Sequence, residues 1–160
     1  MIAALPSENA YKGAYSLVSL LGLGLIIWGK SLASFSMVWQ PFFEWRTFSH
    51  VLMLPAFVLV AAGNMPPSHL GAAVRNPMLL GVVLWGCAHL WANGDLASMI
   101  LFGSFTLWAL VKFVSLGRHY TPAKPPSLIW DGIAIVVGLI LYGLISVYHG
   151  QLFGVGLSIA

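Results

Sequence analysis

Five histidines carry most of the chemistry that this sequence offers. Three of them, His50, His89 and His149, lie near the ends of long apolar stretches, where ionisable side chains are rare and are functional candidates by default. His89 is the strongest candidate, because apolar residues flank it on both sides. The alternative for His89 is a structural role, in which the ring bonds to a neighbouring backbone carbonyl. His69 and His119 fall in predicted loops, where we expect solvated side chains.

The surroundings of His89 favour a flat ligand that contains iron. Gly81, Trp85 and His89 are spaced i, i+4, i+8 and therefore share one face of a helix. Gly81 has no side chain and lets either a flat ligand or another helix come close, and Trp85 can pack against the ligand's edge. Neutral imidazole is a good iron ligand, and two imidazoles on facing helices can clamp a haem. A haem is therefore one ligand that this region could hold, with His89, His50 and His149 as candidate ligands.

Three charged residues are also placed to bind a ligand or to stabilise the fold. Arg75 precedes Asn76-Pro77 and is either an orientation charge or a binding group for a haem propionate, a lipid phosphate or another anion. Asp131 begins the last apolar stretch on the same predicted side as Arg75, so we expect the two to pair. Asp95 either caps the following helix or bonds to a ligand.

Several common functional motifs are absent from the sequence. There is no His-Glu-x-x-His helix of a zinc protease and no Gly-x-Ser-x-Gly turn of a serine hydrolase. No basic cluster is present, which argues against binding to nucleic acid. The single cysteine, Cys87, cannot form an intrachain disulfide.

The composition indicates that lipid, rather than water, solvates the elements that position these residues. Of the 160 residues, 59% are hydrophobic and 7% are charged, whereas soluble domains have about 25% charged residues. So few charges cannot cover a globule with polar groups, which excludes a soluble enzyme, and the high hydrophobicity excludes a disordered chain. We therefore expect one membrane domain over residues 1–160, with the lipid bilayer as its partner.

The apolar residues come in solid blocks, without the alternation that barrel strands show. This pattern predicts an all-α fold, a polytopic transmembrane helix bundle. At roughly 20 residues for each span, the chain has room for about five spans. Their predicted ranges are 14–28, 48–62, 77–91, 96–116 and 129–148.

Lysines and arginines set the expected orientation, because they gather in cytoplasmic loops. Most of them fall on one side of the predicted membrane, namely Lys12, Arg75, Lys112, Arg118 and Lys124. Lys30 and Arg46 fall on the other side. The N-terminus is therefore predicted to be cytoplasmic. This topology brings His50, His89 and His149 to one membrane level near the opposite face.

The residues around His89 resemble the NnrU family of bacterial membrane proteins. The resemblance rests on Arg75-Asn76-Pro77-Met78-Leu79-Leu80, Leu84-Trp85, Ala88-His89-Leu90 and Ala92-Asn93-Gly94-Asp95-Leu96-Ala97-Ser98. Tyr11-Lys12-Gly13 and His149-Gly150 are similar to the early and final segments of that family. Two features depart from the family pattern. Asn76 replaces the histidine of an Arg-His-Pro element, and family members generally carry one more span, with a histidine, ahead of Tyr11.

This resemblance implies a protein of the bacterial inner membrane that is linked to nitrite and nitric oxide reduction in denitrification. The 15-cis-zeta-carotene isomerase is similar to the family and binds haem b through histidines. By that resemblance His89 is the first axial ligand and His50 is the second. A redox or isomerase-like role, the latter acting on an apolar small molecule, is the matching hypothesis.

Two alternatives stay open at this point. One is a structural or assembly subunit of a larger membrane complex, without a cofactor, which the high hydrophobicity suits as well. The other is a membrane methyltransferase-like enzyme that uses S-adenosylmethionine. Asn76 weakens the methyltransferase hypothesis, because the Arg-His-Pro element is what those enzymes share with the NnrU family.

Overall fold

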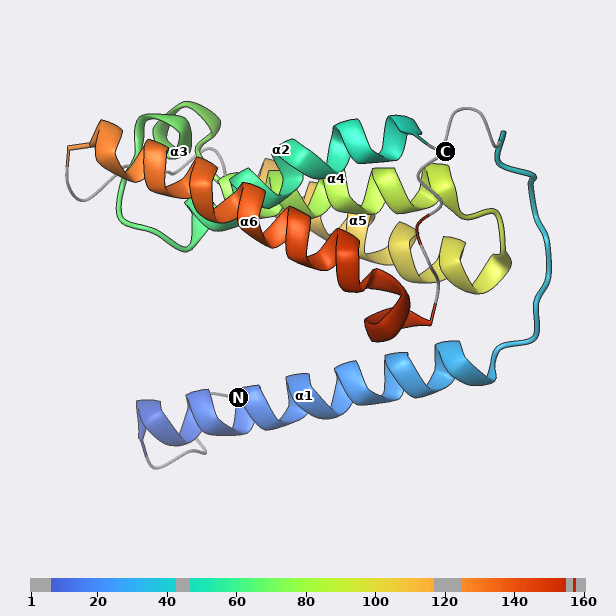
Figure 1. Cartoon of the computed structure of the whole chain (residues 1–160). Helices are drawn as coiled ribbons and strands as arrows, with labels where there is room; N and C mark the ends of the chain where they lie inside the picture. The colour runs from blue at the N-terminus through green and yellow to red at the C-terminus, as the bar shows by residue number, and fades with distance from the viewer. Residues whose placement is uncertain (1–6, 43–46, 117–124, 155–156, 158–160) are drawn as a thin grey trace. The chain divides into compact units, whose positions relative to one another are not determined.

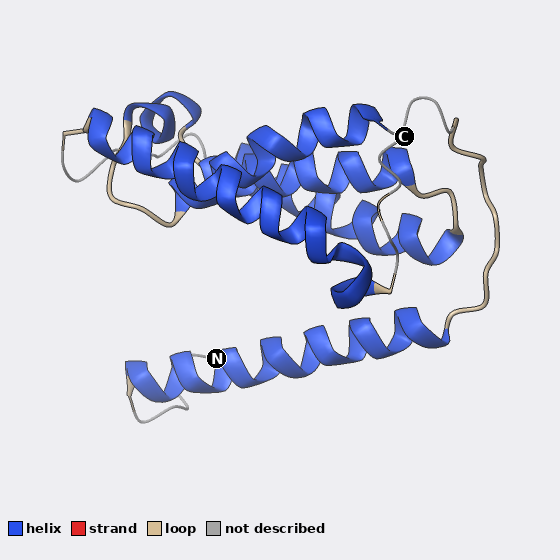
Figure 2. Cartoon of the chain, in the orientation of Figure 1, coloured by secondary structure: helices blue, strands red, loops and turns tan. Residues whose placement is uncertain are grey.

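The computed structural model describes residues 7–42, 47–116, 125–154 and 157. Regular secondary structure in these ranges is entirely helical, as Figure 1 and Figure 2 show, which confirms the all-α prediction. The helices are α1 (Glu8–Leu32), α2 (Thr47–Gly63), α3 (His69–Val74), α4 (Pro77–Ala92), α5 (Leu96–Leu116) and α6 (Leu128–Phe153). All of them except the short α3 correspond to predicted spans.

Three helices in the described ranges are long and apolar enough to cross a membrane. These are α1, α5 and α6, with 25, 21 and 26 residues. The apolar helices α2 and α4 have 17 and 16 residues, so each rises about 25 Å. That length is somewhat less than the roughly 30 Å of a hydrocarbon core. The count of five spans therefore stays a prediction as far as α2 and α4 are concerned.

Side-chain caps explain where two of the helices begin. The Asn76 side chain accepts a hydrogen bond from the backbone N–H of Leu79, and Pro77 occupies the first turn of α4, as predicted. Asp95 accepts from the N–H of Ser98 at 2.9 Å and so caps the start of α5. The structural alternative for Asp95 is thereby confirmed.

The chain divides into two compact units, Met1–Ser36, which contains α1, and Met37–Ala160. Within the second unit the long helices contact one another in the order α5, α4, α2, α6, so that α4 and α2 have neighbours on two sides. The short α3 contacts α2, α4 and α6. The buried apolar residues lie mainly in α2 and α4, because these helices are covered from both sides.

Glycines let α2 approach both of its neighbours closely. A Cβ atom at Gly81 of α4 would lie 2.8 Å from a methyl group of Val60, and one at Gly138 of α6 would lie 2.6 Å from Cα of Val58. Small residues at helix contacts are typical of membrane proteins, where close packing replaces the hydrophobic effect. Gly81 was predicted to admit either a flat ligand or another helix, and in the structure α2 occupies this position.

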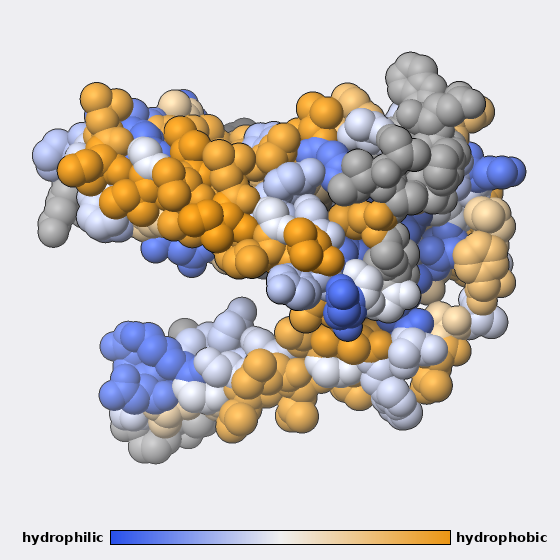
Figure 3. Space-filling model, in the orientation of Figure 1, coloured by the Kyte–Doolittle hydropathy of each residue, from blue (hydrophilic) through white to orange (hydrophobic). Residues whose placement is uncertain are grey.

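The outer helices α5 and α6 present apolar side chains on their surfaces. Exposed residues include Leu107, Val111 and Val114 of α5 and Ile140, Leu144 and Val147 of α6. Figure 3 shows this apolar surface over α6. Patches of this kind are rare on soluble monomers, and they fit a lipid bilayer.

Candidate functional site

The three predicted ligand histidines lie at one end of the Met37–Ala160 unit, which we call the histidine end. His50 is in the first turn of α2, His89 is in the last turn of α4, and His149 is near the end of α6. The start of α2 and the end of α4 meet here, since the ring centroids of Phe48 and Trp91 are 5.7 Å apart. Figure 1 shows the end of α6 on the same side. The three histidines thus lie at the same end of the unit, and their common membrane level stays a prediction.

The ring of His89 is fixed by its own helix. Its Nδ1 lies 2.8 Å from the backbone carbonyl of Trp85. A carbonyl only accepts, so Nδ1 carries the proton and Nε2 keeps a lone pair. The ring stacks on Phe102 of α5 with centroids 4.4 Å apart, and packs against Trp85 at 4.9 Å. This bond is compatible with both a structural role and a ligand role for His89. A histidine that binds a metal through one ring nitrogen also usually donates the N–H of the other to a fixed acceptor.

His50 and His149 have different surroundings. His50 Nδ1 lies 2.9 Å from the hydroxyl of Tyr142 in α6. His149 packs beside Phe153, with centroids 5.0 Å apart. The contacts of His50 thus run to α6, whereas the ring of His89 packs on Phe102 of α5 and on Trp85 of its own helix. His50 and His149 both stay candidate second ligands.

The donor set at the histidine end consists of imidazoles from three helices. Among the residues that the structure describes, no three His, Cys, Asp or Glu side chains converge. A haem needs only one or two axial imidazoles, because its porphyrin supplies the equatorial ligands. The face of α4 that carries Gly81 and His89 is less open than the sequence suggested. α2 fills the space beside Gly81, and Phe102 packs on the ring of His89.

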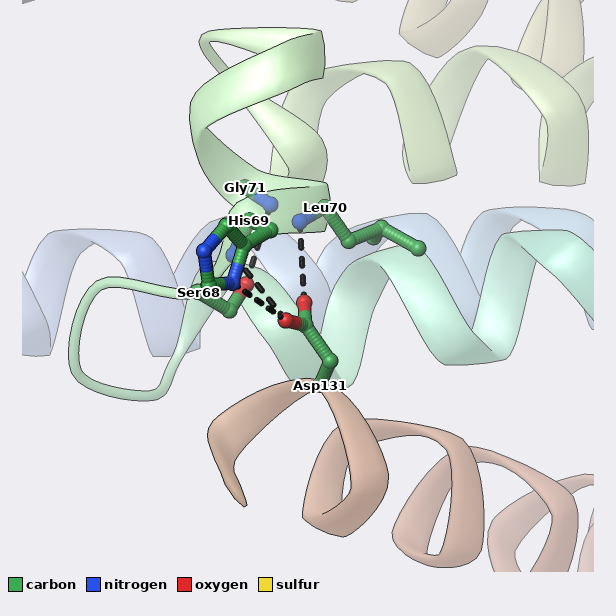
Figure 4. Close-up of polar contacts among 5 residues, drawn as sticks. All are labelled: Ser68, His69, Leu70, Gly71 and Asp131. Atoms are coloured by element: carbon green, nitrogen blue, oxygen red, sulfur yellow. Dashed lines mark hydrogen bonds and ion pairs between the residues drawn. The ribbon is translucent and has the colours of Figure 1, made fainter. Parts of the chain in front are cut away.

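The opposite end of the unit, which we call the α3 end, is organised by a carboxylate (Figure 4). Asp131 Oδ1 accepts the backbone N–H of Leu70 at 2.8 Å, and Oδ2 accepts that of His69 at 3.1 Å. Oδ2 also lies 3.1 Å from the Nδ1 atom of His69. Ser68 adds a local cap, since its hydroxyl accepts the N–H of Gly71 at 2.9 Å. α3 is therefore held at its start by a side chain from α6.

Sequence reasoning missed the role of His69, which it assigned to solvent. The His69 side chain is 53% exposed, yet it bonds to Asp131. A local signal was present, because Ser68 is a favoured N-cap residue directly ahead of an apolar turn. The described contacts of Asp131 go to the start of α3, and its predicted pairing with Arg75 stays a prediction. His119 lies outside the described residues.

Arg75 closes α3, at the opposite end of the unit from the histidine end. It ends α3 with φ 67° and ψ −45°, and its backbone N–H donates to the carbonyl of Gly71 at 2.9 Å. A positive φ is uncommon for a residue other than glycine. The rise of α4 separates Arg75 from His89 by about 20 Å along the helix axis. The structure therefore does not bring Arg75 into one site with His89 and Trp85.

Comparison with known proteins agrees with the resemblance seen in the sequence. The family described as NnrU protein matches residues 1–157, which is nearly the whole chain. No curated protein and no solved structure matches it. The family match covers the histidine end and the α3 end alike, and the chain therefore belongs to the NnrU family.

Proposed function

We propose that this protein binds haem b and spans the bacterial inner membrane several times, with its N-terminus in the cytoplasm. The observation that carries the proposal is the bond from His89 Nδ1 to the carbonyl of Trp85, which leaves Nε2 as an available ligand atom. An imidazole kept in this state within an apolar helix is a functional candidate. Membership in the NnrU family supports a link to nitrite and nitric oxide metabolism.

His89 supplies the first axial nitrogen in this proposal, and His50 or His149 supplies the second. Bound haem would contribute an iron that changes oxidation state, which suits a redox or isomerase-like role. The chain's own residues orient the ligand atoms. The carbonyl of Trp85 holds the ring of His89, and the hydroxyl of Tyr142 holds that of His50. The carbonyl bond fixes the tautomer of His89, because a carbonyl only accepts.

A second candidate function is a structural or assembly subunit without a cofactor. It is favoured by the packing of Phe102 on the His89 ring and of α2 against Gly81, which fill space that a porphyrin would need. The exposed apolar surfaces of α5 and α6 would then contact other subunits as well as lipid.

The visible absorption spectrum of the purified protein separates the two candidates. We expect a Soret band that shifts on reduction with dithionite, and haem extracted in a fixed ratio to protein. His89→Ala should lose the haem, because a non-covalent cofactor depends on axial ligation and fit. The matched control is His119→Ala, which removes a histidine from the segment between α5 and α6 and should keep the full haem content.

Two further variants assign the second ligand. Whichever of His50→Ala and His149→Ala converts a low-spin spectrum to high-spin has removed it. Full haem content and an unchanged spectrum in His89→Ala would exclude His89. A wild-type protein that stays colourless after reconstitution with haem would favour the cofactor-free subunit.

A further inference from the structure

Helix α2 contains a proline near its middle, and the two halves of the helix are packed differently. Pro55 has no backbone N–H and therefore cannot donate to the carbonyl of Val51, one turn earlier. A helix bends most readily at such a position. We call the half before Pro55, residues 47–54, the α2 arm, and none of its residues is buried. The buried residues of α2 all follow Pro55, and they are Ala56, Leu59, Ala61 and Ala62.

Close backbone contacts fix the half of α2 that follows Pro55. A Cβ atom at Gly138 of α6 would lie 2.6 Å from Cα of Val58. A Cβ atom at Gly81 of α4 would lie 2.9 Å from the carbonyl oxygen of Ala56. Helices packed this tightly on both sides cannot separate without losing many contacts at once. This half of α2 is therefore a fixed part of the bundle.

The α2 arm is tied to its neighbours through side chains. His50 Nδ1 lies 2.9 Å from the hydroxyl of Tyr142 in α6. The ring of Phe48 meets that of Trp91 in α4 edge-on, with centroids 5.7 Å apart. Val51, between these contacts and the proline, is 57% exposed. A single hydrogen bond and an aromatic pair stabilise less than a buried face of several residues does. The arm is therefore held more weakly than the rest of α2.

We propose that the α2 arm is a gate at the histidine end, with Pro55 as its hinge and the bond between His50 and Tyr142 as its latch. When the latch breaks, the arm moves away from α4 and α6 while the rest of α2 stays packed. Local opening occurs where few apolar contacts are buried, and hinges are a few residues that absorb the change in backbone angles. The movement displaces His50 and parts Phe48 from Trp91. The proposal does not rest on haem, because hinge and latch belong to this chain alone.

Hydrogen exchange on the full chain in lipid nanodiscs tests the gate. The amides of residues 51–54 report on the arm, and those of residues 59–62 report on the fixed half. In the wild type we expect the arm amides to exchange about tenfold faster or more. Tyr142→Phe removes the latch and should speed the arm by about a further fivefold, the effect of one lost hydrogen bond, without changing residues 59–62. The matched control is Tyr148→Phe, which alters an exposed tyrosine of the same helix and should change neither segment.

A second variant tests the hinge and distinguishes it from fraying of a helix end. Pro55→Ala supplies the N–H that bonds to the carbonyl of Val51, so the arm amides should exchange about tenfold more slowly or less than that. Fraying from the first turn would be unaffected by this change. Should Tyr142→Phe fold poorly, His50→Phe breaks the same bond and gives the same measurement. The proposal is overturned if Pro55→Ala exchanges like the wild type, or if the arm amides match those of residues 59–62 both in the wild type and without the latch.

Discussion

The two ends of the helix unit differ in how many hydrogen bonds their polar side chains make. At the α3 end one carboxylate, Asp131, accepts two backbone N–H groups and contacts the ring of His69. At the histidine end, His89 uses Nδ1 in a bond to the carbonyl of Trp85, and His50 uses Nδ1 in a bond to the hydroxyl of Tyr142. At the α3 end, both carboxylate oxygens of Asp131 have hydrogen-bond partners. The histidine end uses only one of the two ring nitrogens of His89 and of His50 in the bonds described.

This difference separates structural from ligand-binding polarity within one apolar chain. A carboxylate saturated by backbone donors lowers the free energy of one local fold and has little left for a ligand. An imidazole that is oriented by one bond is prepared for a second partner.

The largest effect is expected from removing the carboxylate of the α3 end. α3 has only six residues, and isolated helices of that length are not stable. Asp131→Ala should therefore unfold α3 locally and speed hydrogen exchange at the amides of His69 and Leu70 by about tenfold or more. Asp131→Asn keeps one acceptor oxygen and should give a smaller increase. Unchanged exchange in Asp131→Ala would mean that packing alone holds α3.

A smaller effect is expected from the single bond of His50. Tyr142→Phe removes the hydroxyl and should lower the free energy of unfolding by about 1 kcal/mol, the usual net value of one hydrogen bond. Equilibrium unfolding in mixed micelles measures it. Because His50→Phe breaks the same bond, the double variant should cost less than the sum of the single variants. Strict additivity would show that the two rings do not interact in the membrane.

The smallest effect is expected from a change in backbone conformation, and for Arg75 it is stabilising. It can be compared at the two ends of the unit, since each has one residue with a positive φ. Arg75 has φ 67° at the α3 end, and Gly154 has φ 73° at the end of α6. Arg75→Gly should raise the free energy of unfolding by about 0.5–1 kcal/mol, because glycine adopts positive φ without strain. Gly154→Ala should lower it by about 1 kcal/mol for the same reason. A destabilising Arg75→Gly would show that the Arg75 side chain contributes more to the fold than its backbone costs.

Much of the local structure was predictable because its causes lie within a few residues. The apolar blocks predicted α1, α2, α4, α5 and α6, and the caps Asn76 and Asp95 act on amides only three positions away. Alternating orientation of successive helices then placed His50, His89 and His149 at one end. α3 escaped prediction because six residues are too few to show a period.

The contacts between helices could not be predicted in this way. An apolar helix is hydrophobic on every face, so its sequence does not say which face meets a neighbour. Only the tertiary structure shows that Gly81 packs on α2, that His89 stacks on α5, and that Asp131 caps α3 across 61 residues of sequence. The sequence by itself determined the five long helices and that His50, His89 and His149 lie at one end of them. The tertiary structure decided which polar groups are consumed by the fold and which are left for a ligand, because hydrogen bonds depend on neighbours that only packing supplies.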